Sequence, residues 1–188
     1  MLKFLIDTTN SYLLLAAVKD GNVLFTFINK FINRANETLL NAIDDCLRNN
    51  RLSLKCVDEF YVIIGPGSYT GIRIGVATIL AFSIVYSKPL IGISLLDAYV
   101  LSLDKDIVKA FYCLRDNIYV TKQYSFCDNN YTDYEIIESP ILNFEGSLII
   151  GDNLYNPANT LLNEKLPFFK RDYKPMYFGN NFYDKIKN

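Results

Sequence analysis

The sequence predicts a mixed α/β fold made of two lobes. An antiparallel opening is expected because apolar runs within the first 28 residues are separated by polar turns. A continuously apolar strand at 60–64 then leads through a glycine-rich turn into an apolar helix, as in a mixed or parallel sheet. Apolar density falls near 103–106, and we place the lobe boundary there, giving a first lobe of residues 1–103 and a short second lobe of 104–188.

Local patterns justify each element of the first lobe. The polar turn at 19–22 is a tight hairpin signal, and Asn36 is expected to cap a helix with one apolar stripe. Pro89 ends the next helix, and Ser94 caps the last one. The expected strands are 2–6, 12–18, 23–28, 60–64 and 90–93, and the expected helices are 37–48, 71–87 and 95–101.

The second lobe echoes the first hairpin over a shorter length. Two of its strands flank a polar turn at 115–117, and another turn is expected at Gly151-Asp152-Asn153. From 167 to 188 the tail is aromatic and basic with weak periodicity. The expected strands are 108–114, 118–124 and 148–150, and the expected helix is 158–162.

Composition excludes several classes of function. The net charge is −1, so no overall positive field attracts nucleic acid or an anionic membrane, and contact with RNA is expected through a partner or a local site. The absence of histidine excludes Ser-His-Asp and Cys-His catalysis and the common zinc sites, and we expect no metal site. The four cysteines lack CxxC spacing, so we expect reduced thiols and a cytoplasmic protein. We expect no signal peptide, and the apolar stretch at 74–86 is shorter than a membrane span.

The segment GPGSYTGIRIGVA, residues 65–77, carries the first candidate site. A strand, glycine loop and helix bind anions when free N–H groups and the helix dipole point at one spot. Candidate nucleotide contacts are therefore Asp7, Thr8, Thr9, Gly65, Gly67 and Ser68. The GxGxxxG spacing is one residue longer than the dinucleotide fingerprint, and no P-loop lysine follows. Two turns that only satisfy their own backbone are the alternative.

The helix after this turn offers a second candidate. Gly71 and Gly75 lie four residues apart, and Ala77 and Ala81 continue the small side chains, so another helix could approach closely. Close packing on the chain's own sheet is the alternative. The helix carries more apolar surface than one buried stripe requires.

Three segments taken in order resemble the TsaB (YeaZ) family. They are Leu5 to Thr9, the segment 65–77 with its GPGSYTGIRIG motif, and PLIGISLL at 89–96. The likeness covers about residues 1–100, and later landmarks are Arg115 with Tyr119, Gly151-Asp152 and Pro175-Met176-Tyr177. It implies a bilobal actin-like, Hsp70-like and sugar-kinase (ASKHA) α/β fold, here with a shortened second lobe.

The resemblance also implies a function. TsaB-like proteins are non-catalytic paralogues of TsaD, and with TsaD and a TsaE-like ATPase they serve threonylcarbamoylation of the adenosine beside the anticodon of tRNAs reading codons that begin with A. Implied partners are a TsaD-like paralogue, a TsaE-like ATPase and, through the complex, tRNA, with no membrane. No intrinsic cofactor is implied, and ATP and Mg²⁺ act at the level of the complex. Pairing uses the first two helices, and the implied interface residues are Glu37, Leu40, Ile43, Asp44, Gly71, Arg73, Gly75, Thr78, Ala81 and Phe82.

Two departures from the family pattern stand out. The first helix starts Ala35-Asn36-Glu37 where the family has histidine, serine and glutamate, and Cys113 replaces an aspartate before Arg115. Two other functions stay open. One is a nucleotide phosphotransferase of the same fold, with Asp7, Thr8 and Gly67 gripping phosphates and Mg²⁺. The other is a structural homodimer formed through the second helix.

Overall fold

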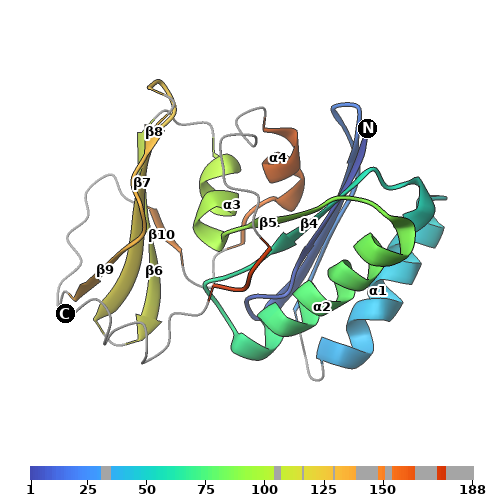
Figure 1. Cartoon of the computed structure of the whole chain (residues 1–188), viewed down its shortest axis with the longest axis horizontal. Coiled ribbons are helices and arrows are strands. Elements are labelled where there is room, and N and C mark those ends of the chain that lie inside the picture. Colours follow the sequence, from blue (N-terminus) through green and yellow to red (C-terminus); the bar gives the residue numbers. More distant parts are fainter. Residues whose placement is uncertain are drawn as a thin grey trace.

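A computed structural model of the chain describes residues 1–30, 35–103, 107–115, 117–128, 130–138, 148–150, 154–163 and 173–176. Two five-stranded sheets form its framework. Figure 1 shows them as separate layers, with two short helices between them and two longer helices on the outer side of the first sheet.

The first sheet has the order β3-β2-β1-β4-β5. Its antiparallel part is the opening meander of β1 (Leu2–Asp7), β2 (Tyr12–Lys19) and β3 (Asn22–Lys30). On the other side of β1, strands β4 (Glu59–Ile63) and β5 (Leu90–Ile93) run parallel to it. The carboxyl ends of β1 and β4 therefore meet at one edge, where the glycine-rich turn begins.

Helices cover both faces of this sheet because its inner strands are apolar on both sides. Helices α1 (Ala35–Asn49) and α2 (Tyr69–Tyr86) share one core with residues such as Phe4 and Val62. Helix α3 (Leu95–Leu101) packs on the opposite face, and all seven of its residues are buried. A short 3₁₀ helix, Leu54–Cys56, precedes β4.

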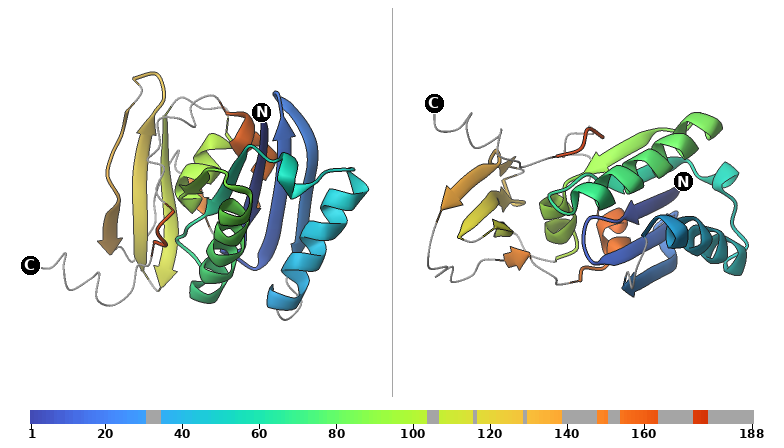
Figure 2. Two further views of the ribbon diagram at one scale, coloured as in Figure 1. Left: turned by 45° about the vertical axis from the view of Figure 1, so that its right-hand side comes forward. Right: turned by 90° about the horizontal axis from the view of Figure 1, so that it is seen from below.

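The second sheet repeats the plan of the first on a smaller scale. Strands β6 (Ile107–Arg115) and β7 (Ile118–Ser125) form a hairpin, and β10 (Leu148–Ile150) runs parallel to β6 as β4 does to β1. Strands β8 (Asn130–Tyr131) and β9 (Glu135–Glu138) both pair with β7. In both views of Figure 2, this sheet and α1 lie at opposite ends of the molecule.

The end of the chain returns to the first sheet. Helix α4 (Pro157–Leu162) lies beside α3, and the Thr160 hydroxyl donates a 2.9 Å hydrogen bond to the Ala98 carbonyl. The Lys3 ammonium donates to the Leu161 carbonyl at 2.9 Å. The Met176 N–H donates to the carbonyl of Ile64 at 2.8 Å. Residues beyond the lobe boundary expected at 103 thus contact the first sheet and α3.

Most of the predicted elements are present with shifted ends. Helix α1 begins at Ala35, so the prediction that Asn36 caps it is wrong. Strands β8 and β9 had not been predicted, because both are short and lie in polar sequence. The turn expected at 151–153 lies outside the described residues, as does the tail expected at 167–188 except for 173–176.

Candidate functional site

The turn after β1 is closed by its own hydrogen bonds. The Asp7 carboxylate accepts from the Thr9 N–H at 2.8 Å, from the Thr9 hydroxyl at 2.7 Å and from the Tyr155 hydroxyl at 3.0 Å. All three residues of the Asp-Thr-Thr turn are at most 1% exposed. Burial raises the pKa of the Asp7 carboxyl above its usual value, although these hydrogen bonds act in the opposite direction.

The glycine-rich turn seals this cluster from the other side. The Ser68 N–H donates to the Thr9 carbonyl at 2.6 Å, and a Cβ added to Gly67 would lie 2.5 Å from that same oxygen. Gly65 has φ +111°, and a Cβ there would lie 2.8 Å from the Met176 carbonyl oxygen. The glycines are therefore required by close backbone approach.

This geometry engages the predicted phosphate contacts within the chain itself, and phosphate binding there stays a prediction. The Asp7 oxygens and the hydroxyls of Thr8 and Thr9 are engaged inside the chain, and the Ser68 hydroxyl accepts from the Gly71 N–H at 3.2 Å as the cap of α2. Gly65 and Gly67 face protein backbone at distances that exclude even a methyl group. These contacts are those expected for the alternative, a tight turn that satisfies its own polar groups.

Gly71 and Gly75 face the inside of the protein. The Thr8 hydroxyl donates to the Gly71 carbonyl at 2.7 Å. A Cβ added to Gly71 would lie 2.0 Å from the Thr8 carbonyl oxygen, and one added to Gly75 would lie 2.3 Å from the Thr8 hydroxyl oxygen. The expectation that these glycines admit a partner helix is therefore wrong, because they let α2 approach the chain's own first strand.

The opposite face of α2 is exposed and apolar. Ala77 and Ala81 are exposed, and Ile84 and Val85 are 68% and 72% exposed. Near the start of the helix, the Arg73 guanidinium lies over the Tyr69 ring at 4.5 Å. The 18-residue helix has a mean hydropathy of 1.5, so by length and composition alone it meets the criterion for a membrane span, against the expectation from the sequence. Only 28% of it is buried, which leaves an apolar surface on the outside.

The other expected interface residues are also partly exposed and partly buried. Leu40 is 56% exposed on α1, and Asp44 lies one turn further on with its carboxylate 2.7 Å from the Arg48 guanidinium. Ile43 is only 2% exposed, so its place in the interface is wrong, because it packs in the core beneath α1. Thr78 and Phe82 on α2 are half-buried. The side chain of Glu37 lies outside the described residues.

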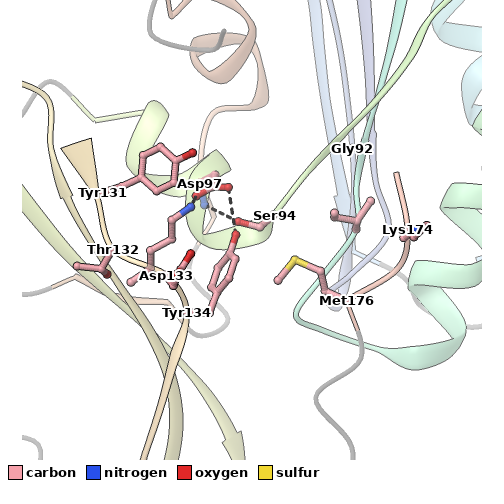
Figure 3. Close-up of a pocket in the computed structure, with 11 residues that line it drawn as sticks. Gly92, Ser94, Asp97, Tyr131, Thr132, Asp133, Tyr134, Lys174 and Met176 are labelled. Carbon is pink, nitrogen blue, oxygen red and sulfur yellow. Dashed lines mark hydrogen bonds and ion pairs between the residues drawn. The ribbon is translucent and has the colours of Figure 1, made fainter. Parts of the chain in front are cut away.

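A pocket of about 260 Å³ lies between the two sheets. Figure 3 shows Tyr131, Thr132 and Tyr134 on one side of it and Lys174 and Met176 on the other. Its lining includes Asp97 on α3, whose carboxylate accepts from the Lys122 ammonium at 2.8 Å.

Sequence reasoning missed this pocket and its buried ion pair. The usable signal was an acidic residue at 97 in the otherwise apolar helix 95–101, together with a lysine at 122 inside a predicted strand. Neither position identifies its partner, because the two lie 25 residues apart in different layers. Among the described residues, no group of three or more His, Cys, Asp or Glu side chains is placed to hold a metal ion.

Comparisons with known proteins identify one matching family model and two structures of the same fold. The family model of TsaD, tRNA N6-adenosine threonylcarbamoyltransferase, matches residues 32–144. The structure of YeaZ from Pseudomonas aeruginosa superposes with a TM-score of 0.74 at 15% identity, covering 94% of this chain and 99% of that one. A structure described by its similarity to the peptidase YeaZ from Pseudomonas aeruginosa gives a TM-score of 0.76 at 14% identity, covering 95% and 99%. No curated protein sequence matches the chain significantly.

The repeated sheet plan, a hairpin with a parallel strand beside it, defines a mixed α/β fold, which the chain shares with the YeaZ structure. In this chain the turn after β1 is closed, and an apolar helix face is open. The chain belongs to the TsaD family and, within it, is a TsaB (YeaZ)-like protein.

Proposed function

We propose that the chain is a non-catalytic partner subunit that pairs with a TsaD-like paralogue and positions it for threonylcarbamoylation of tRNA. The outer face of α2 is the docking surface, and the exposed side of α1 around Leu40 extends it. A TsaE-like ATPase joins the pair, and tRNA is contacted through the assembled complex. ATP and Mg²⁺ act at the level of the complex, and the protein works in the cytoplasm.

The exposed face of α2 carries this proposal. Ile84 and Val85 are among the most exposed large apolar side chains of the described residues, and they share a helix with the exposed alanines 77 and 81. Small residues beside large apolar ones give a surface with low relief onto which a second helix packs closely. A contiguous apolar surface of this kind is typical of a protein interface.

The closed turn after β1 supports a partner role over the phosphotransferase alternative. Phosphate transfer needs carboxylate and hydroxyl oxygens that face the nucleotide and its Mg²⁺. Here the residue Asp7 is only 1% exposed. Its carboxylate already accepts three hydrogen bonds, two from Thr9 and one from Tyr155. Opening this cluster would break all three hydrogen bonds to a buried carboxylate.

Depletion of the protein in its own organism tests the proposed function. We expect mass spectrometry of tRNA nucleosides to show a sharp fall in threonylcarbamoyladenosine, with restoration by the wild-type chain and not by Val85→Glu. The matched control is Val23→Glu, because Val23 is an exposed valine, 48% accessible, on the β2–β3 hairpin. A level that stays unchanged when the protein is gone contradicts the proposal.

A homodimer through the same face is the second candidate, because an exposed apolar helix face also suits a copy of itself. Light scattering of the isolated chain separates the two. A monomer that forms a one-to-one pair on addition of the TsaD-like paralogue supports the proposed function. A dimer that the paralogue does not dissociate favours the homodimer.

A further inference from the structure

A cluster of charged and aromatic side chains joins α3 to the second sheet. Asp97 comes from α3, and Lys122 and Tyr124 come from β7. The Asp97 carboxylate accepts from the Lys122 ammonium at 2.8 Å, from the Tyr124 hydroxyl at 2.5 Å and from the Tyr134 hydroxyl at 3.2 Å. These contacts cross between the two layers, so they fix where the second sheet lies against α3.

The ammonium of Lys122 is enclosed by aromatic rings. It lies 5.0 Å from the ring centre of Tyr124, 4.3 Å from that of Tyr131 and 4.7 Å from that of Tyr134. Ring faces within about 6 Å attract a cation through their quadrupole, and the attraction grows when water is excluded. The Lys122 side chain is only 4% exposed, which meets that condition.

The phenol groups are held in the form that this arrangement needs. Burial, with the nearby Asp97 carboxylate, raises the pKa of both Tyr124 and Tyr134 well above the usual value for tyrosine. Both hydroxyls are protonated at neutral pH, as in any tyrosine, and the raised pKa keeps them as donors to Asp97 in more alkaline solution as well. An isolated buried charge is costly, but here the carboxylate receives three donors and the ammonium faces one carboxylate and three rings.

We propose that Asp97, Tyr124, Tyr131 and Tyr134 form a binding site for a primary ammonium group, which the chain's own Lys122 fills, and that this occupancy holds the second sheet on α3. Lys122 is thus a positioning residue. The inference goes beyond the proposed function, because none of these residues belongs to α1 or α2.

The site is reachable from outside when the lysine side chain is shortened. Asp97, Lys122, Tyr131 and Tyr134 all line the pocket of about 260 Å³ between the sheets (Figure 3). Lys122→Ala removes three carbons and the ammonium, and n-propylammonium replaces that fragment. A small cation added to the variant therefore has both a site and a path to it.

The test is the thermal stability of Lys122→Ala with and without n-propylammonium. We expect the variant to melt about 10 °C below wild type, because the buried carboxylate loses its charged partner. Added n-propylammonium should raise its Tm by about 3 °C or more, increasing with concentration as for a ligand that binds only the folded state. n-Propanol at the same concentrations, which lacks the charge, should not.

Lys109→Ala is the matched control. The Lys109 ammonium lies 5.3 Å from the Phe111 ring centre on the neighbouring strand β6, and the side chain is half-buried. We expect a smaller loss of Tm there and no recovery with n-propylammonium. Equal recovery in both variants, or none in Lys122→Ala, would overturn the proposal.

A second variant covers the case in which Lys122→Ala does not fold by itself. Folding only in the presence of n-propylammonium would support the site. Lys122→Met keeps the length of the side chain without the charge, and it should melt well below wild type. A Lys122→Met variant as stable as wild type would overturn the proposal, because the binding site would then not require an ammonium group.

Discussion

The two faces of α2 differ in what they contact, although they belong to one apolar helix. The inner face carries Gly71 and Gly75, which lie against Thr8 at distances that admit no side chain. The outer face carries Ile84 and Val85, both more than two-thirds exposed. Small residues on a helix therefore mark close approach without telling which partner approaches, and here the glycines serve the fold while the outer face is left for a partner.

Of the changes that compare the two faces of α2, the largest expected effect on folding comes from the inner face. Gly71→Ala should lower the free energy of unfolding by about 2 kcal/mol or more, because the new Cβ would lie 2.0 Å from the Thr8 carbonyl oxygen. Helix propensity alone predicts the opposite sign, a gain of about 1 kcal/mol. Urea unfolding measures the change. Ala77→Gly on the exposed side is the control, with a loss of about 1 kcal/mol from propensity alone. A Gly71→Ala variant as stable as wild type would refute the close approach.

The next effect concerns the contact that closes the first turn. Tyr155→Phe removes the hydroxyl that donates to Asp7 at 3.0 Å and leaves a buried carboxylate oxygen without that donor. We expect a loss of about 1–3 kcal/mol in the free energy of unfolding, which is the usual cost of such a group. A loss below the error of the urea titration would show that this hydroxyl does not stabilise the closed turn.

The pH dependence of stability tests the burial of Asp7. Its carboxyl has a raised pKa in the folded protein, so the folded state keeps the proton at pH values where the unfolded chain has released it. The contribution of this group is therefore full below about pH 3.9 and is lost as the pH rises through the folded pKa. The free energy of unfolding of Asp7→Asn should rise relative to wild type from about pH 4 upward. If the free energy of unfolding of Asp7→Asn instead falls relative to wild type over this pH range, the burial of the Asp7 carboxyl is contradicted.

The smallest effect on folding is expected on the outer face. Val85→Glu should change the free energy of unfolding by no more than about 0.5 kcal/mol, because the side chain is 72% exposed. Val23→Glu, at another exposed valine, should behave alike. A large loss in Val85→Glu alone would mean that this face packs within the chain and is not open to a partner.

The order of strands and helices in the first lobe could be predicted from local signals. The hairpin turn before Val23, the buried strand β4 and the cap at Ser94 all depend on neighbouring residues, and the structure has each of them. The cap of α2 at Ser68 had not been predicted. The predicted start of α1 was less accurate, because the helix begins at Ala35 and the sequence has no strong cap there.

The candidate sites were harder to predict because they depend on contacts that are distant in sequence. Asp7 looked like a ligand for an ion until Tyr155, 148 residues away, was found on its carboxylate. Gly75 looked open until Thr8 was found beneath it. The ammonium site around Lys122 joins residues from α3 and the second sheet, and the local sequence pattern does not predict that these residues meet.

The most direct test of the account is the affinity of this chain for the TsaD-like paralogue from the same organism, measured with purified proteins by calorimetry. We predict that wild type and Val23→Glu bind equally, and that Val85→Glu binds at least about 100-fold more weakly, a change of about 2.7 kcal/mol, while remaining folded. Equal affinity of all three proteins would contradict the claim that the outer face of α2 is the docking surface.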